Sequence, residues 1–336
     1  MKIRIGVLGA TGYTALELLE LLLRHPHAEI VLLSSRQTDH PPIASVHPRL
    51  TGRLNLSLET PTVEEIAARC DCVFSCLPHA ASASSVKPLV DAGVRVVDFS
   101  ADYRLHQAET YSAWYGNEHP DPDRLGGTPY GMPELYKEAI GDAKLVANPG
   151  CYPTSAILPL TPLLREQLIV AEGLVIDAKS GVSGAGRTPK LMTHYPECNE
   201  SICAYGVGQH RHTPEIDQFL GLACGQDVQA IFTPHLTPMN RGILSTIYAQ
   251  PVQTDETKLV ECLRDFYRDA PFVRVVENPP STRDVRGTNF CDIAVKVSRG
   301  RAILVCCIDN LIKGASGAAV QNFNVMYGFE ETSALL

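Results

Sequence analysis

The stretch IRIGVLGATGYTALELLELLLR, residues 3–24, decides the fold of the first part of the chain. A short run rich in Ile, Val and Leu leads into two glycines three residues apart, and a leucine-rich helical pattern follows. Leu16, Leu19 and Leu23 fall on one face of that helix, where they can cover a sheet. This order predicts a β-strand, a tight turn and an α-helix, which together form the opening unit of a parallel sheet.

The rest of the first half repeats this alternation. Further strand-like runs cover residues 30–34, 72–77 and 94–99. Short β-branched runs alternating with helical patterns indicate βαβ units on a parallel sheet. We therefore predict an α/β fold whose residues 1–149 form an N-terminal Rossmann dinucleotide-binding domain.

The second half has a different rhythm, with strands that follow one another more closely. Candidate strands cover residues 174–179, 228–233, 243–250, 291–297 and 302–308. Because fewer crossover helices separate them, residues 150–310 are predicted to form a mixed α+β catalytic domain. The segment 313–329 is again helical in pattern, and we expect the C-terminal helix to return to the first domain, so that residues 311–336 join it.

Composition excludes several classes of protein. The 336 residues are enough for about two domains. Lys and Arg number 29 against 37 Asp and Glu, a net charge of −8 with no basic run, so nucleic acid is not an expected partner. The longest uncharged stretch, Leu145 to Leu164, is interrupted by five residues of Pro and Gly, so no membrane span is expected.

The N-terminus and the cysteines indicate a cytoplasmic protein. Lys2 and Arg4 lie inside or beside the first apolar run, whereas a secretory signal keeps its charges ahead of that run. The eleven cysteines are scattered through apolar segments, which is typical of buried thiols in a reducing compartment.

The turn after the first strand has the spacing of a phosphate cradle. Residues 9–15, GATGYTA, place glycines at 9 and 12 just before the helix. Glycines let the backbone turn sharply and let a pyrophosphate approach the N–H groups at the helix start. We therefore take Gly9, Thr11, Gly12 and Tyr13 as cofactor-binding candidates, with an ordinary strand-to-helix turn as the alternative.

The end of the second strand distinguishes between the two nicotinamide cofactors. Ser34, Ser35 and Arg36 stand where an NAD-preferring site carries Asp or Glu for the ribose 2′-hydroxyl. A carboxylate repels a 2′-phosphate, whereas an arginine and two hydroxyls bind it. These residues favour NADP(H), unless Arg36 is only a solvated residue at a strand end.

The segment LVANPGCYPT, residues 145–154, places one cysteine as a nucleophile. A strand runs into an Asn-Pro-Gly turn, and Pro153 suits the first position of a following helix. Cys151 then lies at or just before a helix N-terminus, where the dipole favours the reactive thiolate. The alternative for this residue, and our expectation for the other cysteines, is a buried and inert thiol.

A nucleophilic cysteine needs an acid/base partner elsewhere in the chain. The candidates are His210, His212 and His235. A surface or N-cap position is the alternative for His212, which precedes Thr-Pro-Glu. Although His210 and His212 form a His-x-His pair, no paired cysteines have zinc-site spacing, so no metal is expected.

Several motifs along the chain carry a family resemblance. They are GATGYT (9–14), LPH (77–79), DFSADYRL (98–105), NPGCYPT (148–154), SGVSGAGR (180–187), HRHTPE (210–215) and PHLTPMNRG (234–242). In this order they resemble the N-acetyl-gamma-glutamyl-phosphate reductases, a family of NADP-dependent acyl-phosphate reductases of arginine biosynthesis. The chain is more distantly similar to aspartate-semialdehyde dehydrogenases. It departs from the family pattern at Ala15, where a third glycine is usual.

The resemblance implies roles for individual residues. Cys151 is the nucleophile and His210 the acid/base. Further residues expected near the nicotinamide are Pro78, Ser180, Gly181 and Asn310. Arg104 is implied to bind the substrate phosphate, and Arg187 and Arg211 are further candidates for an anionic substrate. The family also implies a small-molecule acyl-phosphate substrate and a homodimer or homotetramer.

The implied reaction reduces N-acetyl-L-glutamyl 5-phosphate to the 5-semialdehyde through a thioester on Cys151. Three alternatives stay open: an aspartate-semialdehyde dehydrogenase, an N-acetyl-aminoadipyl-phosphate reductase, and a non-catalytic NADP-binding regulator. The first usually carries Asn before its nucleophile, where this chain has Gly150, and lacks the HRHTPE motif. The second differs by one methylene, which a pocket distinguishes by only about 1–3 kcal/mol.

Overall fold

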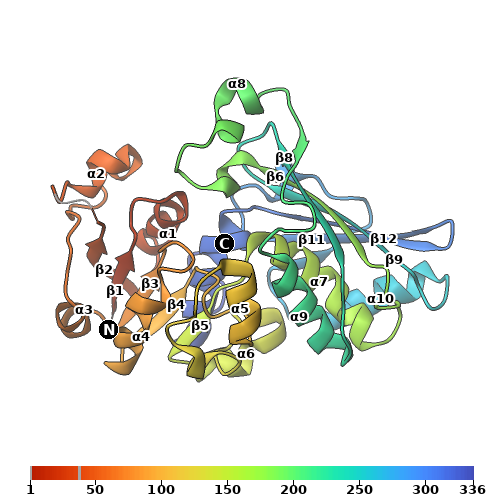
Figure 1. The fold of residues 1–336 in the computed structure, drawn as a ribbon, viewed down its shortest axis with the longest axis horizontal. Helices are drawn as coiled ribbons and strands as arrows, with labels where there is room; N and C mark the ends of the chain where they lie inside the picture. Colours follow the sequence, from red (N-terminus) through yellow and green to blue (C-terminus); the bar gives the residue numbers. More distant parts are fainter. Residues whose placement is uncertain (1, 37–38) are drawn as a thin grey trace. The chain divides into compact units, whose positions relative to one another are not determined.

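The computed structural model describes residues 2–36 and 39–336, which belong to two compact units. The first unit comprises Met1–Pro149 with Ala315–Leu336, and the second comprises Gly150–Gly314. Figure 1 follows both units along the sequence from red to blue.

A five-stranded parallel sheet forms the centre of the first unit. Its strands are β1 (Ile3–Leu8), β2 (Ala28–Ser34), β3 (Cys72–Ser75), β4 (Arg95–Asp98) and β5 (Leu145–Ala147). They are ordered β2-β1-β3-β4-β5, so the chain leaves β1 first to one side and later to the other. Ligands of such sheets bind outside the carboxyl ends of the strands at this reversal. The predicted Rossmann fold is confirmed.

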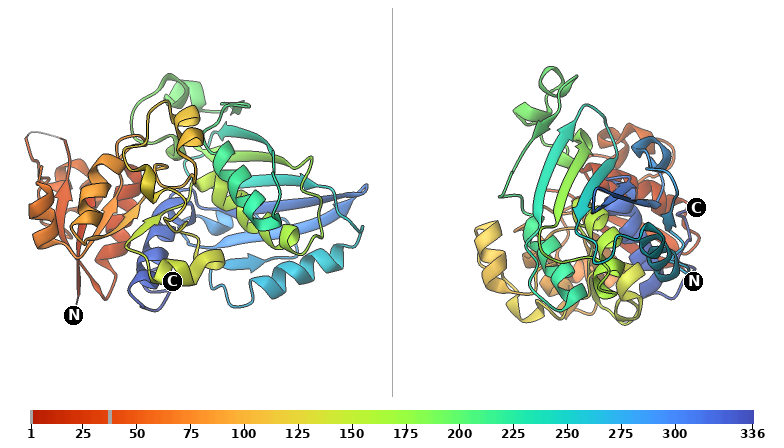
Figure 2. Two further views of the ribbon diagram at one scale, coloured as in Figure 1. Left: turned by 60° about the horizontal axis from the view of Figure 1, so that its bottom comes forward. Right: turned by 90° about the vertical axis from the view of Figure 1, so that its right-hand side faces the viewer.

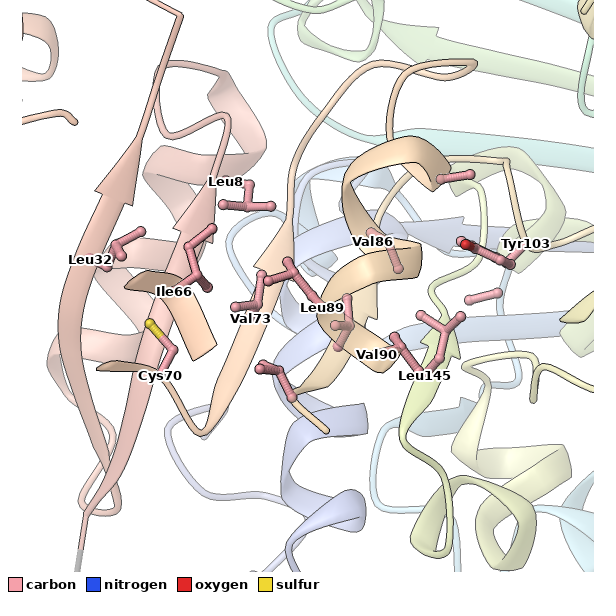
Figure 3. Packing of buried hydrophobic residues seen from close by; sticks show 14 residues of the cluster. Leu8, Leu32, Ile66, Cys70, Val73, Val86, Leu89, Val90, Tyr103 and Leu145 are labelled. Carbon is pink, nitrogen blue, oxygen red and sulfur yellow. The ribbon is translucent and has the colours of Figure 1, made fainter. Parts of the chain in front are cut away.

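Helices cover both faces of this sheet. Those that contact its strands are α1 (Tyr13–Leu23), α3 (Val63–Arg69), α4 (Ala83–Asp91) and α12 (Gly317–Met326). The unit also contains α2 (Ile43–Val46), α5 (Ala108–Tyr115) and α6 (Pro133–Gly141). On one face, Val73 of β3 packs in a buried cluster with Ile66 of α3 and Leu89 of α4 (Figure 3). The next residue, Phe74, points to the opposite face, where its ring meets Phe323 of α12.

The C-terminal helix returns to the first unit as predicted. Helix α12 packs against α1 and α6. Just before it, Ser316 Oγ donates to the Thr14 carbonyl at 2.7 Å, and further along Asn324 Oδ1 meets His25 Nε2 at 2.7 Å. These contacts tie the end of the chain to both ends of α1.

A seven-stranded mixed sheet forms the second unit. Its strands are β6 (Val175–Gly181), β7 (Cys203–Ala204), β8 (Ile231–Thr237), β9 (Ile243–Ala249), β10 (Val273–Val275), β11 (Cys291–Ser298) and β12 (Arg301–Ile308). The order is β10-β11-β12-β9-β6-β8-β7, in which only the β6–β8 and β10–β11 pairs are parallel. The predicted mixed α+β fold is therefore confirmed. Strand β8 lies three to four residues later than the run 228–233 indicates.

Three helices of the second unit pack on this sheet (Figure 2): α7 (Cys151–Arg165), α10 (Glu256–Phe266) and α11 (Thr282–Val285). Helix α9 (Thr213–Cys224) packs against α7, and the short α8 (Tyr195–Cys198) contacts the 3-10 turn Leu191–Thr193. Helix α7 is held on the sheet by a hydrogen bond between Ser155 Oγ and Ser245 Oγ of β9, 2.7 Å long. A π-helical turn, Ile312–Ser316, leads out of this unit.

Helix α7 continues through prolines at 159 and 162, and nearly all of its residues are buried. It begins two residues before Pro153, so the prediction that this proline occupies the first helical position is wrong. Proline is tolerated anywhere in the first turn, because those N–H groups have no partner within the helix. Among the described residues, no helix is long and apolar enough to cross a membrane.

Candidate active site

A cavity of about 600 Å³ opens at the carboxyl ends of β1, β2 and β3. It lies where the strand order reverses, which is the expected place for a ligand. The predicted residues that line it are Gly9, Thr11, Ser34, Ser35, Arg36 and Pro78. Gly12 and Tyr13 cap and begin α1 beside this lining without being part of it.

The turn between β1 and α1 contains two glycines, and the backbone and packing require only the first of them, Gly9. Gly9 has a φ of +71°, and a Cβ there would stand 2.7 Å from the Cys76 carbonyl oxygen. At Gly12, in contrast, an added Cβ would meet its nearest neighbour at 3.9 Å. Packing therefore does not demand a glycine at position 12, where the open space leaves room for a ligand beside the helix start.

The residues at and after the end of β2 give one edge of the cavity two hydroxyl groups and a positive charge. Ser34 ends β2, and its carbonyl accepts the N–H of Ala10 at 3.0 Å, which joins the two strand ends. Ser35 donates its backbone N–H to Glu59 O, and Arg36 follows as an exposed residue. Gln37 and Thr38 lie outside the described residues.

The cavity also has a wall that sequence reasoning missed. This wall consists of Val63 and Ile66 of α3 and Pro88 and Leu89 of α4. These residues follow the ordinary amphipathic pattern of core helices, and no local signal separates them from core residues. Ala15, where the family usually has glycine, is fully buried in α1, so its methyl group is accommodated by the helix packing.

Cys151 is the first residue of α7 and is partly exposed. Gly150 precedes it as the N-cap and donates its N–H to Glu215 Oε1 at 2.9 Å. The Gly150 carbonyl accepts the backbone N–H and the hydroxyl of Thr154, at 3.0 and 2.9 Å. The thiol thus lies at the positive end of α7. The hydrogen bonds of Gly150 to Glu215 and Thr154 hold the first turn of this helix in place.

Half of the other ten cysteines are buried as expected, whereas Cys203 is exposed and four are partly exposed. Burial raises the pKa of Cys70 to about 11 and that of Cys72 and Cys307 to about 12. All eleven cysteines lie in the described residues, and none forms a disulfide. Cys151 differs from these three buried thiols in its exposure and in its place at a helix start.

His210 lies before α9 inside a ring of aromatic side chains. Its ring centroid is 5.6, 5.4, 5.3 and 4.8 Å from those of Tyr152, Tyr205, Phe232 and His212. Burial, with a smaller effect of the charge on Arg211, lowers the pKa of His210 to about 4. Because Nδ1 accepts the backbone N–H of His212 at 3.1 Å, the neutral ring carries its proton on Nε2.

Two tyrosines connect this histidine with the start of α7. Tyr205 donates its hydroxyl to the Tyr152 hydroxyl at 3.1 Å, and Tyr152 donates to the His235 carbonyl at 3.2 Å. Burial is the main cause that raises the pKa of Tyr205 to about 12 and that of Tyr152 still further. Negative charge on Cys151 makes a smaller contribution in the same direction to both pKa values.

The other two candidate histidines have different surroundings. His212 is the N-cap residue of α9, and its backbone fixes the His210 ring. His235 lies in β8 with Nδ1 3.1 Å from Asp177 Oδ1, so its imidazole pairs with a carboxylate on the sheet. This arrangement favours His210 as the acid/base candidate.

Ser180, Gly181 and Asn310 come together at the end of β6. Asn310 accepts the N–H of Gly242 at 2.7 Å and donates to Ser183 Oγ at 3.0 Å. A Cβ at Gly181 would stand 2.5 Å from the Asn240 carbonyl oxygen, so only glycine fits this close approach. Asn310 therefore fastens two loops beside β6.

The three candidate arginines differ in exposure. Arg187 and Arg211 are exposed. Arg104 is 4% exposed, and it donates from Nε to the Asn148 carbonyl at 2.8 Å and from Nη2 to the Phe99 carbonyl at 2.7 Å. No group of three or more His, Cys, Asp or Glu in residues 2–36 and 39–336 is arranged to hold a metal ion.

Known proteins with similar sequences identify the family. A protein of Rhodopirellula baltica named N-acetyl-gamma-glutamyl-phosphate reductase is 53% identical, over 100% of this chain and 99% of its own length. The chain belongs to the family of N-acetyl-gamma-glutamyl-phosphate reductases. A second member, from Geotalea daltonii, is 50% identical over 99% of this chain and 98% of its own length.

Family models and solved structures agree with this membership. Residues 4–143 match the semialdehyde dehydrogenase NAD binding domain, and residues 151–310 match the semialdehyde dehydrogenase dimerisation domain. Aspartate semialdehyde dehydrogenase with NADP from Candida albicans has a TM-score of 0.73 at 19% identity, covering 97% of this chain and 99% of that one. Aspartate semialdehyde dehydrogenase II from Vibrio cholerae also has a TM-score of 0.73, at 16% identity, covering 98% of this chain and 99% of that one. The N-acetyl-gamma-glutamyl-phosphate reductases thus share their fold with these dehydrogenases.

Proposed function

We propose that the protein catalyses the NADPH-dependent reductive dephosphorylation of N-acetyl-L-glutamyl 5-phosphate to N-acetyl-L-glutamate 5-semialdehyde, a step of arginine biosynthesis. The observation that carries this proposal is the partly exposed Cys151 thiol at the first residue of α7. The names of relatives about 50% identical over the full chain support the substrate.

The cavity of the first unit fits an NADP(H) dinucleotide. Gly12 leaves room beside the N-terminus of α1 for a pyrophosphate. Ser34, Ser35 and Arg36 supply hydroxyls and a positive charge for a 2′-phosphate. Pro78, from the same cavity, and Ser180, Gly181 and Asn310 of the second unit are proposed for the nicotinamide end.

Cys151 opens the reaction as the nucleophile. Its sulfur attacks the acyl carbon, a sulfur–carbon bond forms, and the bond from that carbon to the phosphate oxygen breaks. NADPH, when bound, supplies the hydride that reduces the resulting thioester to the aldehyde level. Release of the aldehyde breaks the sulfur–carbon bond and restores the thiolate, and one proton from solvent ends on inorganic phosphate.

His210 assists through Nε2. Since the ring is neutral at pH 7 and Nδ1 is engaged by the His212 backbone, Nε2–H can donate a hydrogen bond to the substrate oxygen on which negative charge develops. Removing one hydrogen-bond donor of this kind typically costs about 10²- to 10³-fold in kcat. The neutral histidine thus acts chiefly as a hydrogen-bond donor to the oxyanion.

The arginines serve a substrate that is anionic at both ends. A guanidinium binds a phosphoryl group or a carboxylate through two parallel hydrogen bonds. We assign this task to Arg104, Arg187 and Arg211. Arg104 is the most rigid of the three, because two of its nitrogens are anchored on backbone carbonyls.

The reverse reaction tests the proposal and separates it from its alternatives. The purified protein is incubated with NADP, phosphate and one aldehyde, and NADPH formation is followed. We expect the highest kcat/KM with N-acetylglutamate 5-semialdehyde and a roughly 10- to 200-fold lower value with the homologue one methylene longer. Turnover of aspartate semialdehyde alone contradicts the substrate, and NADPH binding without any turnover indicates a regulator.

We also propose that the protein assembles as a homodimer or homotetramer and works in the cytoplasm. The dimerisation-domain description of residues 151–310 supports the assembly, as do the exposed apolar side chains Leu191, Tyr195, Ile202 and Val207. Eleven cysteines without a disulfide support the reducing compartment. Sedimentation at micromolar concentration tests the assembly, and a monomer contradicts it.

A further inference from the structure

We propose that Asp102 is a positioning residue for NADPH binding, acting through the loop that connects β3 with α4. The inference rests on the proposed cofactor site, because that loop and the start of α4 contribute Leu77, Pro78, Ser84 and Ser85 to the cavity lining. Asp102 itself is not part of the lining and is fully buried.

The Asp102 carboxylate accepts four hydrogen bonds. Oδ1 accepts the backbone N–H of Ala80 at 2.8 Å and the hydroxyl of Tyr111 at 3.0 Å. Oδ2 accepts the backbone N–H groups of Ser82 at 3.1 Å and Ala83 at 2.9 Å. Three backbone N–H groups from residues 80–83, at the end of the loop and the start of α4, thus converge on a single carboxylate that lies about twenty residues further along the chain.

This carboxylate replaces the local cap of α4. Ser82 occupies the N-cap position, but its side chain makes no capping hydrogen bond. Its hydroxyl instead donates to Asp98 Oδ1 at 2.6 Å and meets Ser75 Oγ at 2.7 Å. The first N–H groups of α4 therefore depend on Asp102, which also places a negative charge at the positive end of the helix.

The loop needs such a restraint because its backbone is strained. Ala80 has a φ of +61°, in the left-handed region that residues with a Cβ disfavour. Its N–H is one of the donors to Asp102. A strained residue persists only where its surroundings determine its conformation. Without the carboxylate, the loop is expected to relax and to shift the cavity residues on both sides of Ala80.

Asp102 is in turn held rigidly. Its backbone N–H donates to Ser100 Oγ at 3.0 Å, and Ser100 Oγ donates to Asp98 Oδ2 at 2.6 Å. His119 Nε2 meets the Asp102 carbonyl at 2.7 Å. Every second residue of the stretch 98–102 thus contributes to one buried network. This gives the DFSADYRL motif a purpose beyond Arg104, because its acidic residues fix the loop that faces the cofactor.

The test is the affinity for NADPH of Asp102→Asn, measured by fluorescence titration of the full-length protein. The substituted amide presents N–H donors toward the N–H groups of Ser82 and Ala83, so about half of the acceptor capacity is lost. Each hydrogen bond to a charged group is worth enough for about a tenfold change in an equilibrium constant. We expect the Kd for NADPH to rise at least about tenfold, with kcat at saturating NADPH within about threefold of the wild type.

The matched control is Asp121→Asn. Asp121 is a carboxylate of the same unit with only 2% exposure, bonded to the Tyr103 hydroxyl at 2.9 Å and to Arg124 at 2.7 Å. Its third partner is Lys87 Nζ of α4 at 3.5 Å, and none of the three partners lines the cavity. The control is expected to lower Tm while leaving the Kd for NADPH within about twofold of the wild type, because the side-chain bonds that it loses do not hold the backbone of the loop between β3 and α4.

The outcomes separate this inference from the proposed function. A wild-type protein that does not bind NADPH refutes the cofactor site itself. If the wild type binds NADPH and folded Asp102→Asn binds it with the same Kd, the positioning role is overturned. An equal rise of the Kd in Asp102→Asn and Asp121→Asn overturns it as well. If Asp102→Asn does not fold, Tyr111→Phe removes one of the four hydrogen bonds and is expected to raise the Kd about two- to fivefold. An unchanged Kd in that variant overturns the role as well.

Discussion

Gly314 lies so close to Cys151 that a Cβ at position 314 would stand 2.7 Å from the Cβ of Cys151 and 3.3 Å from its Cα. Gly314 belongs to the π-helical turn Ile312–Ser316, and its N–H donates to the Asp309 carbonyl at 2.9 Å. Turns of this kind occur frequently at functional sites. The missing side chain lets the turn press against the first residue of α7 and thereby limits where the thiol can point.

Gly314→Ala is expected to displace the nucleophile. Neither backbone can yield without moving α7 or the π-helical turn, so we expect kcat to fall about 10- to 100-fold. Overpacking should also lower the free energy of unfolding by about 1–3 kcal/mol. Steady-state kinetics and urea unfolding measure both effects. Gly141→Ala is the control, because a Cβ there meets nothing within 4 Å. A wild-type kcat in Gly314→Ala contradicts the positioning.

The fold could be predicted where local pattern and tertiary structure agree. The glycine turn and the leucine-rich pattern of residues 3–24 predict β1 and α1 correctly. The predicted covering face is only partly right, because Leu18, Leu19 and Leu22 are buried whereas Leu16 and Leu23 are partly exposed. Strands β7 and β10 were not predicted, because two and three residues are too short to produce an alternating pattern. Helix α7 passes through prolines that signal a break, since burial of almost its whole length outweighs their cost.

The residues of the candidate site likewise divide into those that a local sequence pattern indicated and those that it did not. Gly9, Ser34 and Arg36, which the sequence indicated as cofactor-binding residues, line the cavity, because glycine spacing and strand ends mark such positions in the sequence. Their role in cofactor binding stays a prediction. Glu215 and Asp102 were not singled out, although both hold backbone N–H groups beside the proposed sites. Their partners lie 65 and about 20 residues away, and no local pattern encodes which distant amide a buried carboxylate will meet.

Cys151→Ser is expected to abolish turnover and to spare cofactor binding. A serine hydroxyl is a far weaker nucleophile than a thiolate at neutral pH, so we expect kcat to fall at least about 10³-fold. Intact-mass spectrometry of the wild type mixed with acyl phosphate should reveal the acylated cysteine, and the variant should lack it. Cys203→Ser, at an exposed thiol, should keep wild-type turnover. Substantial activity in Cys151→Ser refutes the nucleophile.

Arg36→Ala is expected to lose the preference for NADPH over NADH. The guanidinium supplies the positive charge beside Ser34 and Ser35, so its removal should raise the Kd for NADPH about 10- to 100-fold and change that for NADH little. Fluorescence titration with both cofactors measures the ratio of the Kd for NADH to the Kd for NADPH. Arg53→Ala removes a surface arginine of the same unit that pairs with Glu20, and should leave the ratio unchanged. An unaltered ratio in Arg36→Ala refutes the 2′-phosphate site.

His210 should make the stability of the protein depend on pH in a predictable direction. Burial lowers its pKa to about 4 in the folded protein, whereas an unfolded chain titrates near 6.5. Between pH 4 and pH 6.5 the unfolded state binds more protons at His210 than the folded state does. The contribution of the neutral His210 to the free energy of unfolding is therefore fully present above about pH 6.5 and is lost as the pH falls toward 4. We expect the difference in unfolding free energy between wild type and His210→Gln to shrink by about 2 kcal/mol from pH 7.5 to pH 4.5. Urea unfolding at both pH values measures it, and the buried His25 and the partly buried His106 cancel because both proteins contain them. A constant difference means that the imidazole is not held neutral by its aromatic neighbours, and the role of Nε2 as the donor then fails with it.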